Sequence, residues 1–253
     1  MSNNREQWGS KLGFILAASG SAVGLGNIWK YPHMAGQNGG AAFTVVYLIC
    51  ILIVGLPILL SELVIGRKTQ LSPVGAFNEL ANKSNWRWVG FIGVASAFVI
   101  LSFYGVVGGW TLRYTFFSLT GGFEALSGNP NASGDIFNSF ISDSINPIIW
   151  QLIFMSFCVG IIVKGVKSGI EEGSKIMMPL IIAILAVLAV RGVTLDGGSD
   201  GLTFLFKPKF SDLTPSSIVL ALGHAFFTLS LGMGTMITYG SYLDKKQNLF
   251  NSA

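Results

Sequence analysis

Glycine, hydroxyl and amide side chains are concentrated near the middle of the first long apolar stretch. Gly20, Gly24 and Gly26 lie within seven residues, beside Ser21 and Asn27. Each glycine costs about 1 kcal/mol relative to alanine in a helix, so this sequence weakens a helix. A break would free carbonyl groups that can hold a cation. It would also free N–H groups that can hold a carboxylate, helped by the helix dipole. An amino acid presents both charges, and a sodium ion takes oxygen ligands, so both would suit such a break.

Two other interpretations of this segment exist. Small residues also let helices approach closely, and Gly20 and Gly24 form a G-x-x-x-G pattern. From the residues alone, close packing and a break are equally good explanations. A dinucleotide-binding loop fits poorly, because no strand precedes Gly24 and the third glycine of that motif is absent.

A second segment repeats this pattern late in the chain. Thr228, Ser230, Gly232 and Gly234 again place hydroxyls and glycines inside an apolar stretch. Five crossings separate the two segments, so they are expected to run antiparallel. Two interrupted apolar segments at corresponding places are typical of the binding site of a secondary transporter.

Membrane-spanning helices are the elements that must position these segments. Apolar residues make up 51% of the chain and charged residues 11%, with a mean hydropathy of +0.61, whereas soluble domains carry about 25% charged residues. A helix needs about 20 mostly apolar residues to cross a bilayer. Six stretches qualify, with breaks expected near 22–26 and 228–232: 12–36, 41–66, 88–120, 147–163, 173–192 and 216–243. The sequence predicts an all-α membrane protein, because no segment keeps the alternation of a membrane barrel.

Lysine and arginine residues predict the orientation of these spans. With the N-terminus in the cytoplasm, eleven basic residues fall on the inner side and five on the outer side. The bias favours a multi-pass protein of the plasma (inner) membrane with a cytoplasmic N-terminus. A cleaved signal peptide ending near Ser19 is the weaker interpretation, since five further spans need none.

Other residues offer little further chemistry. Cys50 and Cys158 lie in apolar runs and the two histidines are far apart, so neither a disulfide nor a metal site is expected. No credible nucleophile–base pair is present, so the chain is not expected to be an enzyme, and no nucleic-acid partner is expected. Glu62 is an acid inside a predicted span, which raises a functional question, although capping or pairing is the simpler explanation. Glu171 and Glu172 are expected to be solvated in an inner loop.

The sequence also resembles a known family. The run from Trp8 to Pro32 is similar to the neurotransmitter:sodium symporters, most of all to the bacterial amino-acid members, and so are Asn38–Phe43, Gly55–Pro57 and Phe226–Gly232. The order and spacing match over essentially the whole chain. The resemblance implies a fold of two inverted five-helix repeats. It implies that residues 1–253 are a single, incomplete membrane domain, with the first repeat and helix six, and that this piece alone shows no sodium-driven uptake.

The resemblance implies roles at the two predicted breaks. Ala22, Asn27 and Thr228 would bind the first sodium ion, and Gly20 and Val23 would form half of a second sodium site. The N–H groups of Leu25 and Gly26 and the hydroxyl of Tyr104 would receive the substrate carboxylate. The other implied substrate-binding residues are Ser21, Ala22, Ile100, Phe227, Thr228, Ser230 and Met233.

Three of these positions bear on the substrate. Gly24 stands where the monoamine-transporting members have an aspartate, and a carboxylate there would repel the carboxylate of an amino acid. The resemblance therefore favours an amino-acid substrate. Ile100 and Met233 hint at a neutral, apolar side chain, although packing explains these two residues equally well. For Tyr104, an aromatic on an apolar helix, packing is the more common role.

Gates are implied by the same resemblance. Arg5, Trp8 and Tyr242 are similar to an inner gate. Lys30 stands where the family usually has an outer-gate arginine. Because lysine cannot form a bidentate pair, a looser gate is expected.

Two further motifs are implied. Gly169 and Pro179 match the family motif for unwinding the inner end of helix five. Tyr47, His224 and Thr228 resemble a chloride-site frame, with His224 where a glutamine is usual, so chloride dependence stays open.

The function expected from the resemblance is sodium-coupled symport of a neutral amino acid by alternating access. Na⁺ is the expected coupling ion, and an amino acid and the lipid bilayer are the expected partners. The alternative is a membrane sensor or binding subunit that keeps the site without transporting. The oligomeric state is not indicated.

Overall fold

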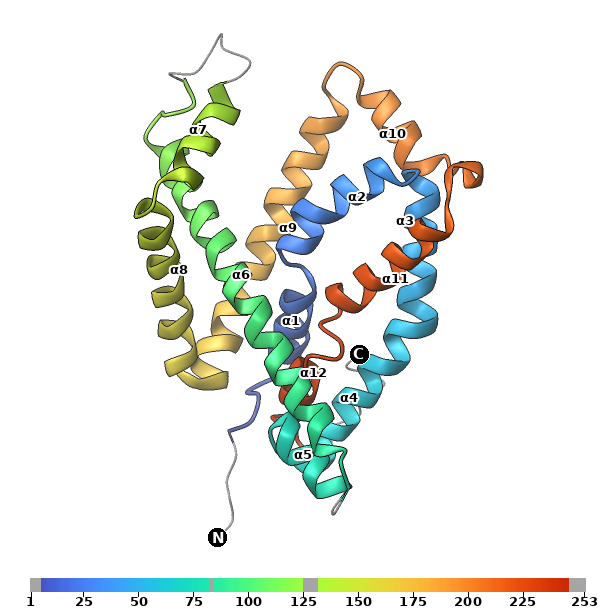
Figure 1. Cartoon of the computed structure of the whole chain (residues 1–253), viewed down its shortest axis with the longest axis vertical. Coiled ribbons are helices and arrows are strands. Elements are labelled where there is room, and N and C mark those ends of the chain that lie inside the picture. The colour runs from blue at the N-terminus through green and yellow to red at the C-terminus, as the bar shows by residue number, and fades with distance from the viewer. Residues whose placement is uncertain (1–5, 82–83, 125–131, 246–253) are drawn as a thin grey trace. The chain divides into compact units, whose positions relative to one another are not determined.

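The computed structural model describes residues 6–81, 84–124 and 132–245, and the helices of these residues are drawn in Figure 1. The chain forms two compact units, which are described separately. The first holds the residues up to Val94 and those from Val166 onward, and the second holds Ala95–Gly165. Helices are the regular structure throughout, and the described residues contain no strand.

The first unit contains most of the helices. They are α1 (Lys11–Ala22), η1 (Gly26–Lys30), α2 (Tyr31–Gln37), α3 (Ala41–Cys50), η2 (Ile51–Gly55), α4 (Leu56–Thr69), α5 (Pro73–Leu80), the start of α6 (Arg87–Leu119), η4 (Val166–Glu171), α9 (Glu172–Val193), α10 (Gly198–Phe206), η5 (Phe210–Asp212), α11 (Pro215–Thr228) and α12 (Thr235–Gly240). The second unit holds the rest of α6, α7 (Ala132–Ser142) and α8 (Asn146–Val163).

Among the described residues, four continuous helical segments are long and apolar enough to cross a membrane: Ala41–Thr69, Arg87–Leu119, Asn146–Val163 and Val166–Val193. The pair Lys11–Ala22 and Gly26–Gln37 also qualifies when it is counted as one span, bent by 47°. The last predicted span, 216–243, for which a break is expected near 228–232, forms two short helices, because the chain leaves the helix between Thr228 and Thr235. The fifth span begins earlier than predicted, since Val166–Glu171 is wound as a π-helix.

Local sequence explains where the two interrupted spans begin. Ser10 caps α1 by accepting a hydrogen bond from the Gly13 N–H at 2.9 Å. Thr214 and Ser217 form a capping box at the start of α11, and Pro215 occupies the first turn, where its missing N–H has no cost. Both spans therefore begin at well-defined residues.

The core of the first unit lies where the interrupted spans meet the span formed by α3 and α4. Figure 1 shows α11 beside α3, and the contacts place α12 against α4. Gly66 and Gly240 allow the backbones of α4 and α12 to approach, because a Cβ at either position would overlap the backbone of Ile237 or Leu63. Two buried clusters hold these helices together, one of Phe14, Leu63, Met236 and Leu243 and one of Ala35, Phe43, Tyr47, Ala221 and Ala225.

Candidate ion and substrate site

The first interruption lies between Ala22 and Gly26. Val23 ends α1 with φ −87° and ψ 78°, and its N–H donates to the Ser19 carbonyl at 2.7 Å. Asn27 lies beyond the interruption, and its Nδ2 donates to the Ala22 carbonyl oxygen at 2.7 Å. The side-chain amide thus satisfies a carbonyl that the end of the helix leaves without a helical partner.

The second interruption runs from Leu229 to Gly234 and is held from outside. Ser230, Gly232 and Gly234 adopt left-handed backbone conformations, with φ of 54°, 75° and 73°. Glu62, on α4, accepts a hydrogen bond from the Gly232 N–H at 2.7 Å through Oε1. The Glu62 side chain is buried, and its Oε2 has no hydrogen-bond partner within the described part of the chain.

The two interruptions contact each other through polar side chains. The Thr228 hydroxyl donates to Oδ1 of Asn27 at 2.9 Å. The Tyr47 hydroxyl donates to Oγ1 of Thr228 at 2.9 Å, and the hydroxyls of Ser21 and Ser230 are 3.0 Å apart. Ala22, Asn27, Thr228 and Tyr47 therefore form one hydrogen-bonded chain, and the Ser21–Ser230 contact is a second link between the interruptions.

This chain joins the three residues predicted for the first sodium site. The Ala22 carbonyl, the Asn27 amide oxygen and the Thr228 hydroxyl are the kind of oxygen ligands that sodium takes at interrupted helices. A sodium ion bound here would replace the hydrogen bond that Asn27 donates to Ala22. Gly20 and Val23 lie at the end of α1, where helix carbonyls have no helical partner, and the second sodium site stays a prediction.

The predicted substrate-binding residues fall in both units. Leu25 and Gly26 lie at the start of η1, where the first N–H groups have no partner within the helix. Phe227 lies in the last turn of α11, and Met233 lies in the second interruption with Ser230. Ile100 and Tyr104 belong to the part of α6 in the second unit, so their role stays a prediction.

An apolar cavity adjoins both interruptions. Ala22 and Leu229 line it together with Phe14, Ala18, Leu59 and Met236. Ala22 is the predicted substrate-binding residue in this lining.

The predicted gate residues are partly brought together. Trp8 donates from Nε1 to the Tyr239 carbonyl at 3.0 Å, and its N–H donates to the Tyr242 carbonyl at 3.1 Å. Arg5 lies outside the described residues. Nζ of Lys30 is 5.9 Å from the centre of the Phe227 ring, which is within the range of a cation–π interaction.

Aromatic side chains surround the predicted chloride frame. The His224 ring stacks on Tyr31 at 5.5 Å and lies 5.4 Å from the ring of Tyr47. His224 is buried, and its Nε2 has no hydrogen-bond partner among the residues that the structure describes. Chloride dependence stays open.

The predicted unwinding motif is wound in this structure. Gly169 is buried in η4, and Pro179 lies inside α9. The unwinding of this segment stays a prediction.

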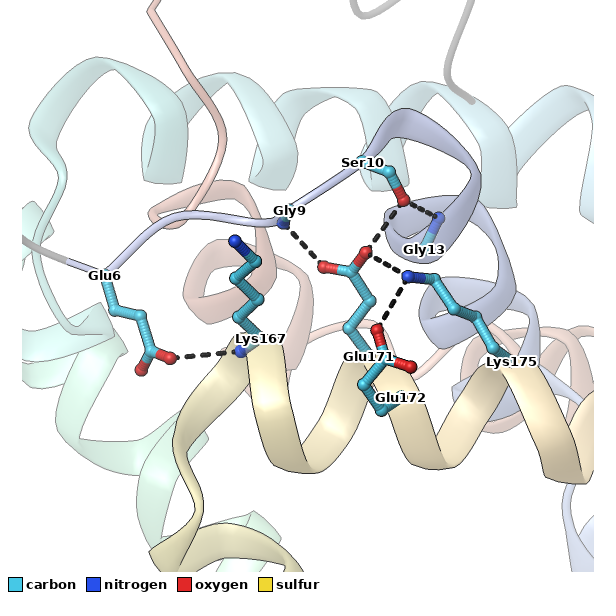
Figure 2. Close-up of polar contacts among 8 residues, drawn as sticks. All are labelled: Glu6, Gly9, Ser10, Gly13, Lys167, Glu171, Glu172 and Lys175. Carbon is cyan, nitrogen blue, oxygen red and sulfur yellow. Dashed lines mark hydrogen bonds and ion pairs between the residues drawn. The ribbon is translucent and has the colours of Figure 1, made fainter.

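Glu171 is the residue whose surroundings differ most from the sequence-based expectation. The expectation that it is solvated is wrong, because its side chain is buried against the segment before α1. The carboxylate accepts hydrogen bonds from the Gly9 N–H at 2.6 Å and the Ser10 hydroxyl at 2.7 Å, and it pairs with Lys175 at 2.9 Å (Figure 2). These partners on the leading segment lie about 160 residues earlier in the sequence, so no local pattern identifies them. Glu172 is largely exposed, as expected.

Comparison with known proteins gives consistent matches. The model of the sodium:neurotransmitter symporter family matches residues 5–131 and 135–253. The chain is 45% identical to the sodium-dependent transporter YhdH of Bacillus subtilis over 98% of this chain and 54% of that protein. It is 31% identical to a human sodium-dependent neutral amino acid transporter, over 97% of this chain and 37% of that one.

A solved structure matches as well. The crystal structure of MhsT in complex with L-phenylalanine superposes with a TM-score of 0.90 at 49% identity, over 98% of this chain and 56% of that one. The chain spans about half the length of the bacterial relatives that it matches. The fold prediction of an all-α transporter is confirmed. The chain belongs to the sodium:neurotransmitter symporter family.

Proposed function

We propose that the protein is a symporter that couples the inward movement of sodium ions to uptake of a neutral amino acid by alternating access. The observation that carries the proposal is the hydrogen-bonded chain from Ala22 through Asn27 to Thr228. It joins the two interrupted spans, and its oxygen atoms suit a sodium ion. The family membership and the sodium-dependent relatives support the same function.

The interrupted helices supply opposite charges to one substrate. Carbonyls at the end of α1 carry partial negative charge and suit the cation, whereas the N–H groups of Leu25 and Gly26 at the start of η1 suit a carboxylate. A substrate carboxylate that also contacts the sodium ion would make the binding of each depend on the other. The substrate class is supported by MhsT, which binds L-phenylalanine, and by the absence of a carboxylate at Gly24.

The proposal is tested on the full-length protein by a thermal-shift screen of the twenty amino acids in sodium and in potassium. A neutral amino acid should raise the unfolding temperature in sodium, with little effect in potassium. Thr228→Val should weaken sodium and amino-acid binding together, because one hydroxyl serves the shared site. Thr238→Val is the matched control, since within the described residues the Thr238 hydroxyl donates to the carbonyl of Gly234, the residue just before its own helix, and not to Asn27 or Ala22.

Uptake into vesicles separates transport from sensing. Sodium-driven accumulation supports the symporter, whereas sodium-dependent binding without accumulation would favour the sensor or binding subunit. Sodium dependence that is unchanged in Thr228→Val would contradict the assignment of this residue.

A further inference from the structure

A hollow beside α10 is lined by four charged side chains, and none of the predicted ion or substrate residues lines it. The lining of this charged cavity includes Asp200, Lys207, Lys209 and Asp212, with Gly39 from the turn before α3. Its volume of about 280 Å³ is slightly below that of pockets that enclose drug-sized ligands, about 300–1,000 Å³. The cavity therefore suits a small polar group.

The charged cavity lies at the ends of two membrane spans. Gly39 comes two residues before the span Ala41–Thr69, and Asp200 comes seven residues after the span Val166–Val193. The helix α10 contacts both α3 and α9, and Figure 1 shows it between their ends. Spans end where the hydrocarbon core meets the headgroup layer. A group bound in this cavity therefore lies at the depth of lipid headgroups.

The turn before α3 holds one side of the cavity in place. Gly39 and Gly40 have positive φ values of 93° and 55°, which glycine adopts without a steric penalty. A Cβ on Gly39 would lie 3.3 Å from the Cβ of Asp212, and a Cβ on Gly40 would lie 2.7 Å from the Phe204 carbonyl oxygen. The turn therefore packs directly against α10 and η5, which fixes the position of Asp212.

The apolar face of α10 lies opposite the charged cavity. Leu202, Leu205 and Phe206 have the i, i+3, i+4 spacing of one helix face, and Phe206 is 78% exposed. Asp200 and Lys207 are about two turns apart on the other face. A helix with an apolar face and a charged face is typical of segments that lie in the membrane interface. The faces of α10 thus agree with the depth that the span ends give.

Two lysines bring positive charge to the cavity from one extended segment. Lys207 has φ −106° and ψ 94°, and Lys209 has φ −112° and ψ 92°, with Pro208 between them. Alternate side chains of an extended segment lie on the same side, and both lysines line the cavity. Each ammonium group has three N–H donors and no acceptor, so the pair suits a phosphate group.

Two aspartates bring the opposite charge. The ion pairs of the described residues are those of Lys175, so none joins Asp200 or Asp212 to the lysines of the cavity. Asp212 accepts a hydrogen bond from the neighbouring Ser211 hydroxyl at 3.1 Å through Oδ1. Both signs of charge therefore stay available around one small hollow. A ligand that carries an anionic group and an ammonium group would satisfy both.

We propose that the charged cavity binds the headgroup of phosphatidylethanolamine, with the phosphate on Lys207 and Lys209 and the ammonium group on Asp200 and Asp212. Phosphatidylglycerol has the phosphate but no ammonium group, and the quaternary ammonium of phosphatidylcholine has no N–H donor, so each satisfies the cavity less well. A free amino acid carries similar charges, but the depth of the cavity favours a lipid. The proposal does not depend on the transport function.

The test measures which lipids the full-length protein retains. The protein is placed in nanodiscs of phosphatidylethanolamine, phosphatidylglycerol and phosphatidylcholine in equal parts, released into mild detergent and analysed by native mass spectrometry. Phosphatidylethanolamine should be the enriched lipid. Replacing Lys207 and Lys209 together by Gln should weaken its binding about tenfold, the factor that corresponds to about 1.4 kcal/mol. The control replaces Lys68 and Lys164, which are exposed and outside the cavity, by Gln and should leave the enrichment unchanged.

The aspartates are tested separately, because they should decide which lipid is preferred. Replacing Asp200 and Asp212 together by Asn keeps both lysines for the phosphate and removes the acceptors for the ammonium group. The preference for phosphatidylethanolamine over phosphatidylglycerol should then disappear, while phosphatidylglycerol is retained as before. The matched control replaces Asp135 and Asp196, which are exposed and outside the cavity, by Asn and should keep the preference.

Three outcomes would overturn the proposal. The first is equal retention of the three lipids by the unsubstituted protein. The second is a loss in either cavity variant that its control variant matches. The third is displacement of the lipid by free glycine as readily as by glycerophosphoethanolamine, since the cavity would then take soluble zwitterions. Enrichment of phosphatidylethanolamine that is lost in the lysine variant and turned into equal retention with phosphatidylglycerol in the aspartate variant would support it.

Discussion

Both the first and the last span leave the helix near the middle, but the two interruptions differ in backbone conformation and in the hydrogen bonds that hold them. At the first interruption, neither Gly20 nor Gly24 has a positive φ, and a Cβ on Gly24 would have no atom within 4 Å. At the second, Gly232 and Gly234 adopt left-handed conformations that alanine accepts only at a cost. The first interruption is bridged by the local Asn27 amide, and the second is held by a carboxylate from another span.

This difference shows that glycine can have two structural roles in an interrupted membrane helix. In the second interruption it permits a backbone conformation that other residues resist. In the first it leaves room, since the backbone itself does not require it. Substitutions at the two sites should therefore have unequal effects on stability, even though the two sequences look alike.

The largest effect is expected for Gly234→Ala. Its φ of 73° is left-handed, and a Cβ would lie 2.5 Å from Cγ of Pro73. Strain and overlap together should lower the free energy of unfolding by about 2–4 kcal/mol. Thermal unfolding in detergent measures this loss. A variant as stable as the unsubstituted protein would show that the second interruption does not need glycine here.

Removal of the Glu62 carboxylate should have the next largest effect. Glu62→Ala leaves the Gly232 N–H without its acceptor and should destabilise the protein by about 1–3 kcal/mol. Glu62→Gln keeps a carbonyl oxygen that can accept, so it should lose less. The unfolding temperatures of the two variants are compared with that of Glu172→Ala, whose side chain is exposed. Equal losses in the alanine and glutamine variants would contradict a role for this hydrogen bond.

The sequence predicts much of this architecture because membrane spans need long apolar runs. Composition and residue spacing predict the apolar spans and an interruption in the first and the last of them, but the fifth span begins at Val166 and not at the predicted residue 173. They do not predict that Ser230, which is not a glycine, adopts a left-handed conformation in the second interruption. They also do not show that η4 is wound up to Glu171, which depends on contacts with a distant segment.

The sequence also predicts part of the candidate site, because polar residues inside apolar runs are easily recognised. Asn27 and Thr228 stand out as polar residues in apolar runs, and the structure brings them into hydrogen-bond contact. Glu171 does not stand out, because an acid near the inner end of a span is ordinarily solvated. Its burial follows from the path of residues 6–10, which no periodicity encodes. Long-range partners of buried charges are the part of this site that the sequence leaves out.

Asn27→Ala tests the local bridge at the first interruption. It removes a donor to the Ala22 carbonyl and an acceptor for Thr228, and it should cost about 0.5–1.5 kcal/mol in sodium-free buffer. Asn27→Asp keeps an acceptor for Thr228 and loses the donor, so it isolates the bridge. If both variants unfold at the temperature of the unsubstituted protein, the amide does not hold the first interruption.

The smallest effect is expected for Gly24→Ala, the counterpart of Gly234→Ala. The site has room for a methyl group and no positive φ, and alanine restricts the unfolded chain more than glycine does. Stability should therefore stay within about 0.5 kcal/mol of the unsubstituted protein or rise slightly. Gly24→Asp also places its Cβ in open space and adds a negative charge, so it should weaken binding of an amino acid more than Gly24→Ala does. A loss of stability in Gly24→Ala that matches Gly234→Ala would mean that glycine serves the backbone at both interruptions, and the distinction between them would be wrong.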